Sequence, residues 1–198
     1  GSYAGYSLLA SQQQLLSAQT TIDRNALRVI DLIQSDIRMA GYNDYRYYQS
    51  PSAIIPSQAI VISNSTDFSV VYDQDINNRV LVHYFITPYT SSTSGLTRNR
   101  LMRDLRYCPV PINPSVGCTL SSSSSTSNGQ PILDWVQYFS VIGLSPKTTV
   151  GSYQCQFQSL QVELCVNVPD KIQGMNKSLS DYLTLKKFKF LTSAKNVS

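Results

Sequence analysis

Apolar residues recur at three- and four-residue steps through the later part of the first forty positions. The members of this series are Ile22, Ala26, Ile30, Ile33, Ile37 and Ala40. This spacing places their side chains on one stripe of an α-helix, and no proline interrupts residues 6–40. Gly41 follows the series and can take the positive φ that a helix end commonly needs. The pattern predicts a helix over residues 6–40, about 50 Å long at 1.5 Å per residue.

The first turns of this predicted helix carry apolar side chains of their own. Four leucines, Leu8, Leu9, Leu15 and Leu16, extend the apolar surface beyond what a compact domain would obviously cover. One explanation is a frayed extension next to Gly1-Ser2, which has the composition of a cloning scar. The other is a helix that packs against other subunits, and the four leucines are then the predicted interface residues.

Beyond residue 58 the apolar period changes from helical to alternating. Phe68, Val70 and Tyr72 alternate with polar residues, and a second alternating series follows a turn at 73–78. The second series comprises Val80, Val82, Tyr84 and Ile86. Two half-buried strands separated by a short turn predict a β-hairpin.

More strands are predicted toward the C-terminus. One spans 136–142 after Trp135, and Phe188 and Phe190 mark a last short one. The cleanest alternation lies between them, at 160–168. Its apolar face comprises Leu160, Val162, Leu164, Val166 and Val168, while Cys165 is on the opposite face. Such alternation is typical of a sheet with one face on a core and the other in water.

The remaining segments indicate loops and fix the expected fold class. Residues 87–98 have turn composition, and 105–131 is predicted to be a long loop with a Ser-rich, low-complexity part at 119–128. A helix followed only by strands is typical of an α+β domain in which the helix packs on an antiparallel sheet. We therefore expect a single domain over 1–198, with its β-sheet region at 59–192.

Composition argues against a dedicated nucleic-acid groove. Charged residues make up 14% of the chain and the net charge is +4, without a dense Lys/Arg run. Aromatic and basic side chains do alternate at Tyr42, Tyr45, Arg46, Tyr47 and Tyr48, and again at 186–190. Stacking and charge together could hold single-stranded nucleic acid or a glycan there. A tyrosine-rich surface loop and an amphipathic strand explain the pattern better, so we expect no strong nucleic-acid binding.

Four cysteines fall in two pairs with ten-residue spacing: Cys108 and Cys118, and Cys155 and Cys165. No Cys-x-x-Cys motif accompanies them, and His83 is the only histidine, so the sequence supports neither a zinc site nor a thioredoxin-like motif. An even count indicates disulfides and an oxidising compartment. Short spacing favours a Cys108–Cys118 and a Cys155–Cys165 bond, although three connectivities remain open.

Other candidate sites are weak. A Ser-His-Asp arrangement would need His83, which lies mid-strand, and no Gly-x-Ser-x-Gly motif accompanies it. Asp73, Asp75 and Asn77 resemble the start of a calcium loop, but Asn78 stands where the loop needs glycine. A hairpin turn explains the segment better. We expect no enzyme activity, no cofactor and no metal.

Residues 36–42, Asp36, Ile37, Arg38, Met39, Ala40, Gly41 and Tyr42, form the most informative motif. They resemble the signature that ends the long N-terminal helix of PilW-type minor pilins of type IV pili. Weaker similarities follow in order in the strands of 59–86, at 135–138, at 159–168 and at 191–196, where Lys195 replaces the usual arginine. The Ser-rich loop and the cysteine pairs have no counterpart in the family pattern.

This resemblance implies a pilin-like fold and a role in assembly. A PilW-like protein is a prepilin, anchored in the bacterial inner membrane by the front half of its helix and facing the periplasm. It is then processed and packed with other minor pilins and the major pilin at the pilus tip on the cell surface. The present chain would be its soluble, N-terminally truncated part. It would prime or cap the pilus and support adhesion, twitching motility or DNA uptake indirectly.

Two other functions remain open. A GspJ-like minor pseudopilin of type II secretion has the same order of helix and sheet, although Met39 to Tyr42 favour the pilus family. A pilus-tip adhesin or DNA-binding module would instead use the aromatic and basic residues directly.

Overall fold

The computed structural model of the chain describes residues 2–42, 59–75, 78–90, 92, 95, 97–108, 124–125, 129–144, 159–166 and 186–193. Its elements are α1 (Ser2–Met39), β1 (Ile60–Asn64), β2 (Asp67–Asp75), β3 (Asn78–Thr90), β4 (Thr97–Tyr107), β5 (Ser124–Ser125), β6 (Gln130–Leu144), β7 (Ser159–Val166) and β8 (Lys186–Ser193). One helix followed by strands confirms the α+β class.

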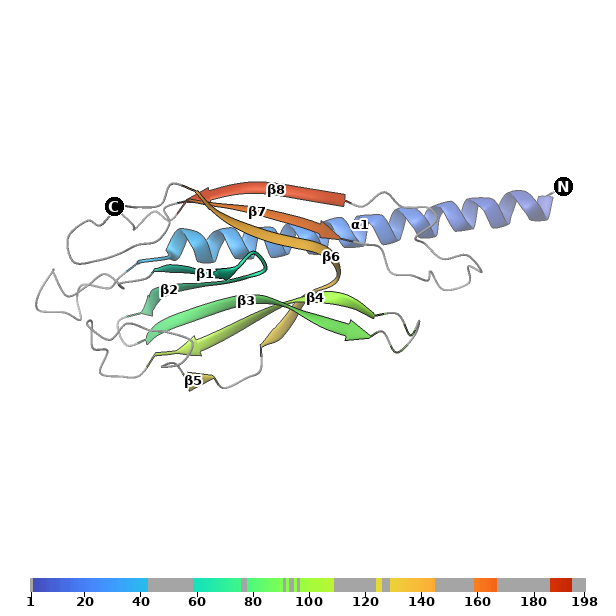
Figure 1. Cartoon of the computed structure of the whole chain (residues 1–198). Helices are drawn as coiled ribbons and strands as arrows, with labels where there is room; N and C mark the ends of the chain where they lie inside the picture. The colour runs from blue at the N-terminus through green and yellow to red at the C-terminus, as the bar shows by residue number, and fades with distance from the viewer. Residues whose placement is uncertain are drawn as a thin grey trace, which may run out of the picture.

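The helix α1 has two different environments along its length. Its 38 residues span about 57 Å. The C-terminal half lies against the sheet, whereas the N-terminal half extends past the ends of the strands (Figure 1). Burial follows this division, because the predicted stripe from Ala26 to Ala40 is buried and Ile22 packs at its border. The predicted helix and its buried face are therefore confirmed.

The strands form one antiparallel sheet in the order β1-β2-β3-β4-β6-β7-β8, with the short β5 paired to β4. The sheet is strongly curled, so that β3 and β4 lie on one side of the helix and β7 and β8 on the other (Figure 1). The long β6 makes this possible because its first part pairs with β4 and its second part with β7. The backbone N–H of Val141 in β6 also donates to the carbonyl of Ser65, which tightens the curl.

The core fills the space between the curled sheet and the C-terminal half of α1. The strands β2, β3 and β7 contribute alternate residues, as the sequence pattern predicts, and β1, β4 and β6 contribute further ones. The ring of Phe68 stacks on Tyr84 at 5.0 Å between centroids and on Phe139 at 6.3 Å. Because Phe139 belongs to β6 and the other two to β2 and β3, these rings join the two sides of the curl.

Two predicted loops contain strand residues, and those parts of the prediction are wrong. Residues 87–90 belong to β3 and 97–98 to β4, while 105–107 complete β4 and 130–131 begin β6. Within the Ser-rich segment 119–128, Ser124–Ser125 form β5, and the rest lies outside the described residues. Four arginines interrupt any apolar alternation in β4, so hydrophobic periodicity does not reveal this central strand.

Candidate functional site

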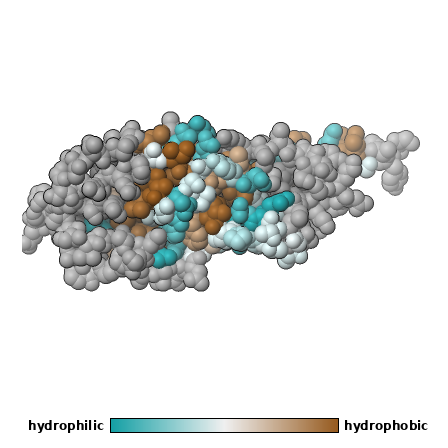
Figure 2. Space-filling model, in the orientation of Figure 1, coloured by the Kyte–Doolittle hydropathy of each residue, from teal (hydrophilic) through white to brown (hydrophobic). Residues whose placement is uncertain are grey.

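The N-terminal half of α1 is the strongest candidate for an interaction surface. Leu8, Leu9 and Leu16 have 63%, 60% and 63% of their surface exposed. Leu27 is 52% exposed although it belongs to the packed half. The side chain of Leu15 lies outside the described residues. Figure 2 shows hydrophobic side chains on the part of the helix that extends from the domain.

Three of these leucines form a second apolar stripe along the helix. Leu9, Leu16 and Leu27 are separated by seven and eleven residues, and both steps return to nearly the same side of an α-helix. This side differs from the buried one, because Leu27 is exposed directly next to the buried Ala26. Burying a leucine side chain is worth about 1.5–3 kcal/mol. The stripe therefore favours contact with another apolar surface.

A buried carboxylate fixes the other end of the helix to the sheet. The Asp36 side chain accepts hydrogen bonds from the hydroxyl of Tyr72 at 2.9 Å and from the hydroxyl of Tyr84. Arg103 donates to both carboxylate oxygens, at 2.9 Å from Nε and 3.3 Å from Nη2. These four bonds use the full acceptor capacity of a carboxylate. Asp36 thus connects α1 with β2, β3 and β4.

The position of Asp36 explains why it needs these partners. It lies three residues before α1 ends, where the free carbonyl groups already favour positive charge. Burial, and then the negative charge of Asp36, raise the pKa of Tyr72 and of Tyr84 above the usual range. Burial opposes the charge of Arg103, but the hydrogen bonds and charge of Asp36 raise its pKa overall. The cluster is therefore an ion pair supported by two neutral phenols.

The rest of the helix-end motif has structural roles. Ile37 and Ala40 are fully buried, and Met39 packs at the edge of the core. Gly41 has φ +76° and donates its N–H to the carbonyl of Val71 at 2.9 Å. The carbonyl of Tyr42 accepts from the N–H of Asp73 at 2.9 Å. Arg38 is exposed. The motif that carries the resemblance therefore joins α1 to β2.

Sequence reasoning missed the contribution of Arg103. Its strand was not predicted, and the pairing of residues 36 and 103 is a long-range contact without a local pattern. One signal was present: an aspartate near a helix C-terminus on the apolar stripe needs a cation.

The two described cysteines differ in their bonding state. Cys165 is a free thiol, so the predicted Cys155–Cys165 bond is wrong. It lies in β7, where its backbone pairs with Tyr138 of β6 and Lys187 of β8. Cys108 is disulfide-bonded. Its predicted partner Cys118, like Cys155, lies outside the described residues, so that pairing stays a prediction.

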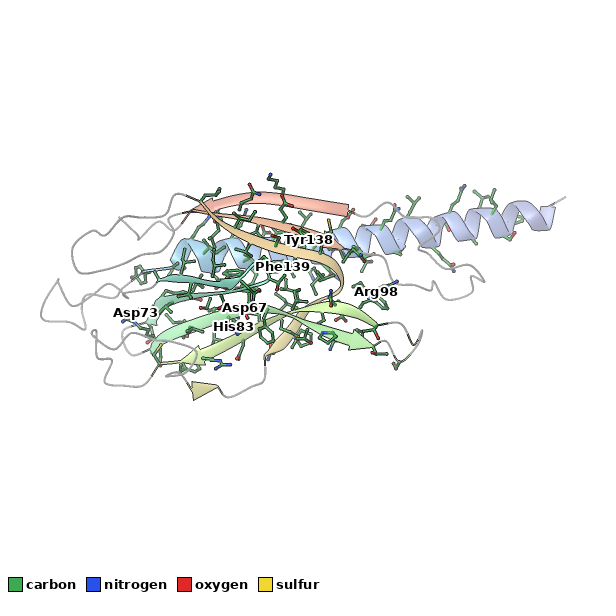
Figure 3. The ribbon with its side chains drawn as sticks, viewed as in Figure 1. Asp67, Asp73, His83, Arg98, Tyr138 and Phe139 are labelled. Carbon is green, nitrogen blue, oxygen red and sulfur yellow. The ribbon has the colours of Figure 1, made fainter. Side chains whose placement is uncertain are left out.

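Residues of two weak candidate sites form ordinary side-chain contacts within the sheet. Nε2 of His83 lies 2.8 Å from Oδ1 of Asp67 on the neighbouring strand (Figure 3). The His83 ring also stacks on Phe85. Asp73 forms a buried ion pair with Arg79 at 2.6 Å, and Asp75 accepts from the side-chain amide of Asn78. Among the described residues, no group of three or more His, Cys, Asp and Glu side chains is arranged to hold a metal.

The structure describes only part of the two segments in which aromatic and basic residues alternate. Tyr45, Arg46, Tyr47 and Tyr48 lie outside the described residues. In β8, Lys189 is exposed, and its Nζ lies 3.5 Å from Oε1 of Glu163 in β7, so the two form an ion pair.

Comparisons with known proteins do not assign the chain. No protein family, curated protein or solved structure matches it. In the described part of the chain, no helix is both long and apolar enough to span a membrane.

Proposed function

We propose that this chain is a pilin-like subunit, similar to PilW-type minor pilins, that primes or caps a type IV pilus through its long helix. The observation that carries the proposal is the second leucine stripe, exposed on a helix whose other half is fixed in the domain. A helix presented in this way suits packing against the helices of other subunits. The proposed partners are other minor pilins and the major pilin.

The helix-end motif at residues 36–42 gives this proposal independent support. Its residues determine how the helix leaves the domain, through Asp36 and the backbone bonds of Gly41 and Tyr42. A fixed exit direction is necessary if several subunits are to align their helices in one assembly. In the proposed role, the inner membrane anchors the precursor, the domain faces the periplasm, and the assembled subunit reaches the cell surface at the pilus tip. No catalytic step is involved.

Charge substitutions on the leucine stripe test the proposal. The double variant Leu9→Glu/Leu16→Glu, co-produced with the minor pilins of the same genome, should no longer co-purify with them. Its circular dichroism should be unchanged, because both side chains are exposed. The matched control is Ser7→Glu/Gln14→Glu, which has the same seven-residue spacing on the opposite side of the helix. Normal co-purification of the leucine variant would refute the interface.

The precursor sequence gives a second test. The proposal expects a short basic leader ending in glycine, followed by an aromatic residue and an apolar run with an early glutamate. An Ala-x-Ala signal peptide would remove the pilin interpretation altogether. Neighbouring genes would then distinguish a pilus from a type II secretion system.

A further inference from the structure

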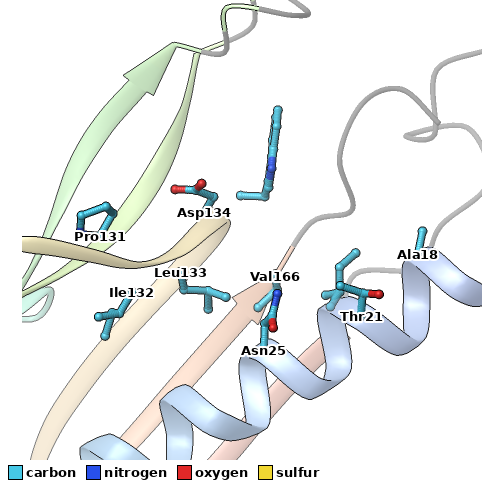
Figure 4. A pocket seen from close by; sticks show the side chains of 10 residues that line it. Ala18, Thr21, Asn25, Pro131, Ile132, Leu133, Asp134 and Val166 are labelled. Atoms are coloured by element: carbon cyan, nitrogen blue, oxygen red, sulfur yellow. The ribbon is translucent and has the colours of Figure 1, made fainter. Parts of the chain in front are cut away.

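A groove lies where the helix emerges from the sheet. Its volume is about 440 Å³, and it is formed by the Ala18–Asn25 stretch of α1, the 131–135 stretch of β6 and Val166 of β7. Figure 4 shows Thr21 and Asn25 on the helix side of this space and Leu133 and Asp134 on the strand side. The volume is within the range of small-molecule sites in proteins.

The strand wall of the groove is a β-bulge. Leu133 pairs with Leu101 and Val136 with Asn99, so β6 has one residue more than β4 between these pairs. Trp135 occupies the bulge with φ +63°, and it is the only described residue other than glycine with a positive φ. Bulges commonly turn a side chain toward a functional site, and such strained backbone is concentrated there.

A chain of contacts holds the tryptophan and the adjacent carboxylate in place. Nε of Arg100 donates to Asp134 at 2.5 Å, and its guanidinium lies 3.7 Å from the centre of the Tyr89 ring. Tyr89 in turn meets Trp135 edge to face, with 6.4 Å between ring centroids. Tyr89 therefore contacts the indole directly, and Arg100 connects Tyr89 with Asp134, so that side chains of three strands are linked to one another beside the groove.

The groove's chemistry limits what it can bind. Among the described side chains that line it, Asp134 is the one that carries charge, and Arg100 already neutralises it. Thr21 and Asn25 offer a hydroxyl and an amide, while Ile22, Leu133 and Val166 provide an apolar floor. An anion would find no unpaired cation among these side chains. A neutral ligand with one apolar face and several hydroxyl groups matches all three features.

We infer that this groove is a binding site for a neutral sugar ring, such as one unit of a cell-surface polysaccharide. The apolar face of the ring would lie against Trp135, and its hydroxyl groups would bond to Asn25, Thr21 and Asp134. The inference goes beyond pilus assembly and does not depend on it. The groove contains none of the leucines of the second stripe.

The tryptophan itself provides the measurement. Trp135 is the only tryptophan of the chain, so its fluorescence reports directly on the groove. We would titrate the purified protein with glucose, galactose and N-acetylglucosamine. At least one of them should change the emission saturably, with a dissociation constant in the millimolar range expected for so small a ligand.

Two variants and one control connect the signal to the groove. Asn25→Ala should weaken binding about tenfold, the effect of losing one hydrogen bond. Arg24→Ala, a substitution of an exposed neighbour that does not line the groove, should bind like the unmodified chain. Trp135→Gly, measured by calorimetry, should lose binding without unfolding, because glycine tolerates the positive φ. No saturable response to any sugar, or equal affinity in Asn25→Ala, would overturn the inference.

Discussion

Asp36 places a negative charge in the last turns of a helix, where the backbone dipole disfavours it. The cost is offset by Arg103 and by two phenols whose hydroxyl groups can only donate to the carboxylate while they stay protonated. Each donor therefore strengthens the others, and removing one of them leaves Asp36 with an unfilled acceptor position in a low-dielectric site.

Substitution of Asp36 tests the energetic importance of this cluster. Asp36→Ala leaves Arg103 and two buried hydroxyl groups without their acceptor. We expect the free energy of unfolding to fall by about 3 kcal/mol, the low end for breaking a buried ion pair, because Arg103 keeps some contact with water. Urea unfolding followed by circular dichroism measures this. The control Asp31→Ala, on the exposed side of the same helix, should change stability by less than about 0.5 kcal/mol.

The two phenols predict a specific loss of stability at high pH. The pKa of Tyr72 and of Tyr84 is raised in the folded state, so above pH about 10 both ionise in the unfolded chain before they ionise in the folded one. The folded state then binds more protons, and stability falls as pH increases. Each tyrosine contributes about 1.4 kcal/mol per pH unit to this slope.

Substitution of Tyr72 by phenylalanine removes one of the two phenols and so tests this pH dependence. Tyr72→Phe should lose stability near pH 8 but should have a smaller slope between pH 9 and 11, on the order of one tyrosine's contribution. Urea midpoints across this range measure both effects. Parallel pH profiles for the variant and the unmodified chain would contradict the assigned linkage.

At the scale of elements, α1 is held by only part of its length. Its N-terminal half extends past the ends of the strands and contributes no residue to the described core, whereas the half from Ala26 to Ala40 is part of that core. Isolated helices are marginal in water because their stability comes mainly from tertiary packing. The two halves should therefore open with very different free energies.

Amide hydrogen exchange of the isolated chain tests this difference. Amides of residues 3–16 should exchange quickly, at or near the rate of an unprotected helix. Amides between Val29 and Ile37 should be protected to nearly the global free energy of unfolding. Binding to partner subunits should slow exchange in the first segment alone. Uniform protection along α1 would contradict a helix that depends on packing.

The elements also show how far sequence patterns reach. The helix, the β2–β3 hairpin and β7 were predictable because each buries one face and repeats its period several times. β4 was not, because Arg98, Arg100, Arg103 and Arg106 give it a charged composition. Arg100 and Arg103 pair with carboxylates of other elements, Asp134 of β6 and Asp36 of α1, whereas Arg106 pairs with Asp104 of its own strand. Local periodicity contains no information about such long-range pairs, and for the same reason the Asp36 cluster and the Trp135 groove could not be predicted.

At the scale of the whole molecule, part of the positive charge is neutralised by aspartates within the described part of the chain. Four described arginines are paired with aspartates: Arg79–Asp73, Arg100–Asp134, Arg103–Asp36 and Arg106–Asp104. These arginines are therefore poorly available for phosphate groups. The net charge of +4 does not correspond to a basic groove among the described residues.

We therefore predict weak, nonspecific DNA binding. The dissociation constant should be about 100 μM at physiological salt, and binding should weaken steeply with added salt because counterion release drives it. Titration of labelled single- and double-stranded DNA at two salt concentrations provides the test. Low-micromolar affinity at the higher salt, lost in Arg46→Ala, would instead favour a DNA receptor at the tip.

The way α1 is attached also has a mechanical consequence. The helix runs alongside β7 and β8 (Figure 1), and its Asp36 bonds reach three strands at once. Tension on the N-terminal end would therefore pull along the helix axis in shear, so the core contacts and the carboxylate bonds would have to break together and not one after another. Rupture under force is governed by the barrier to unfolding. A fibre subunit attached in this way would withstand a pull along its axis far better than a sideways peel of the same magnitude.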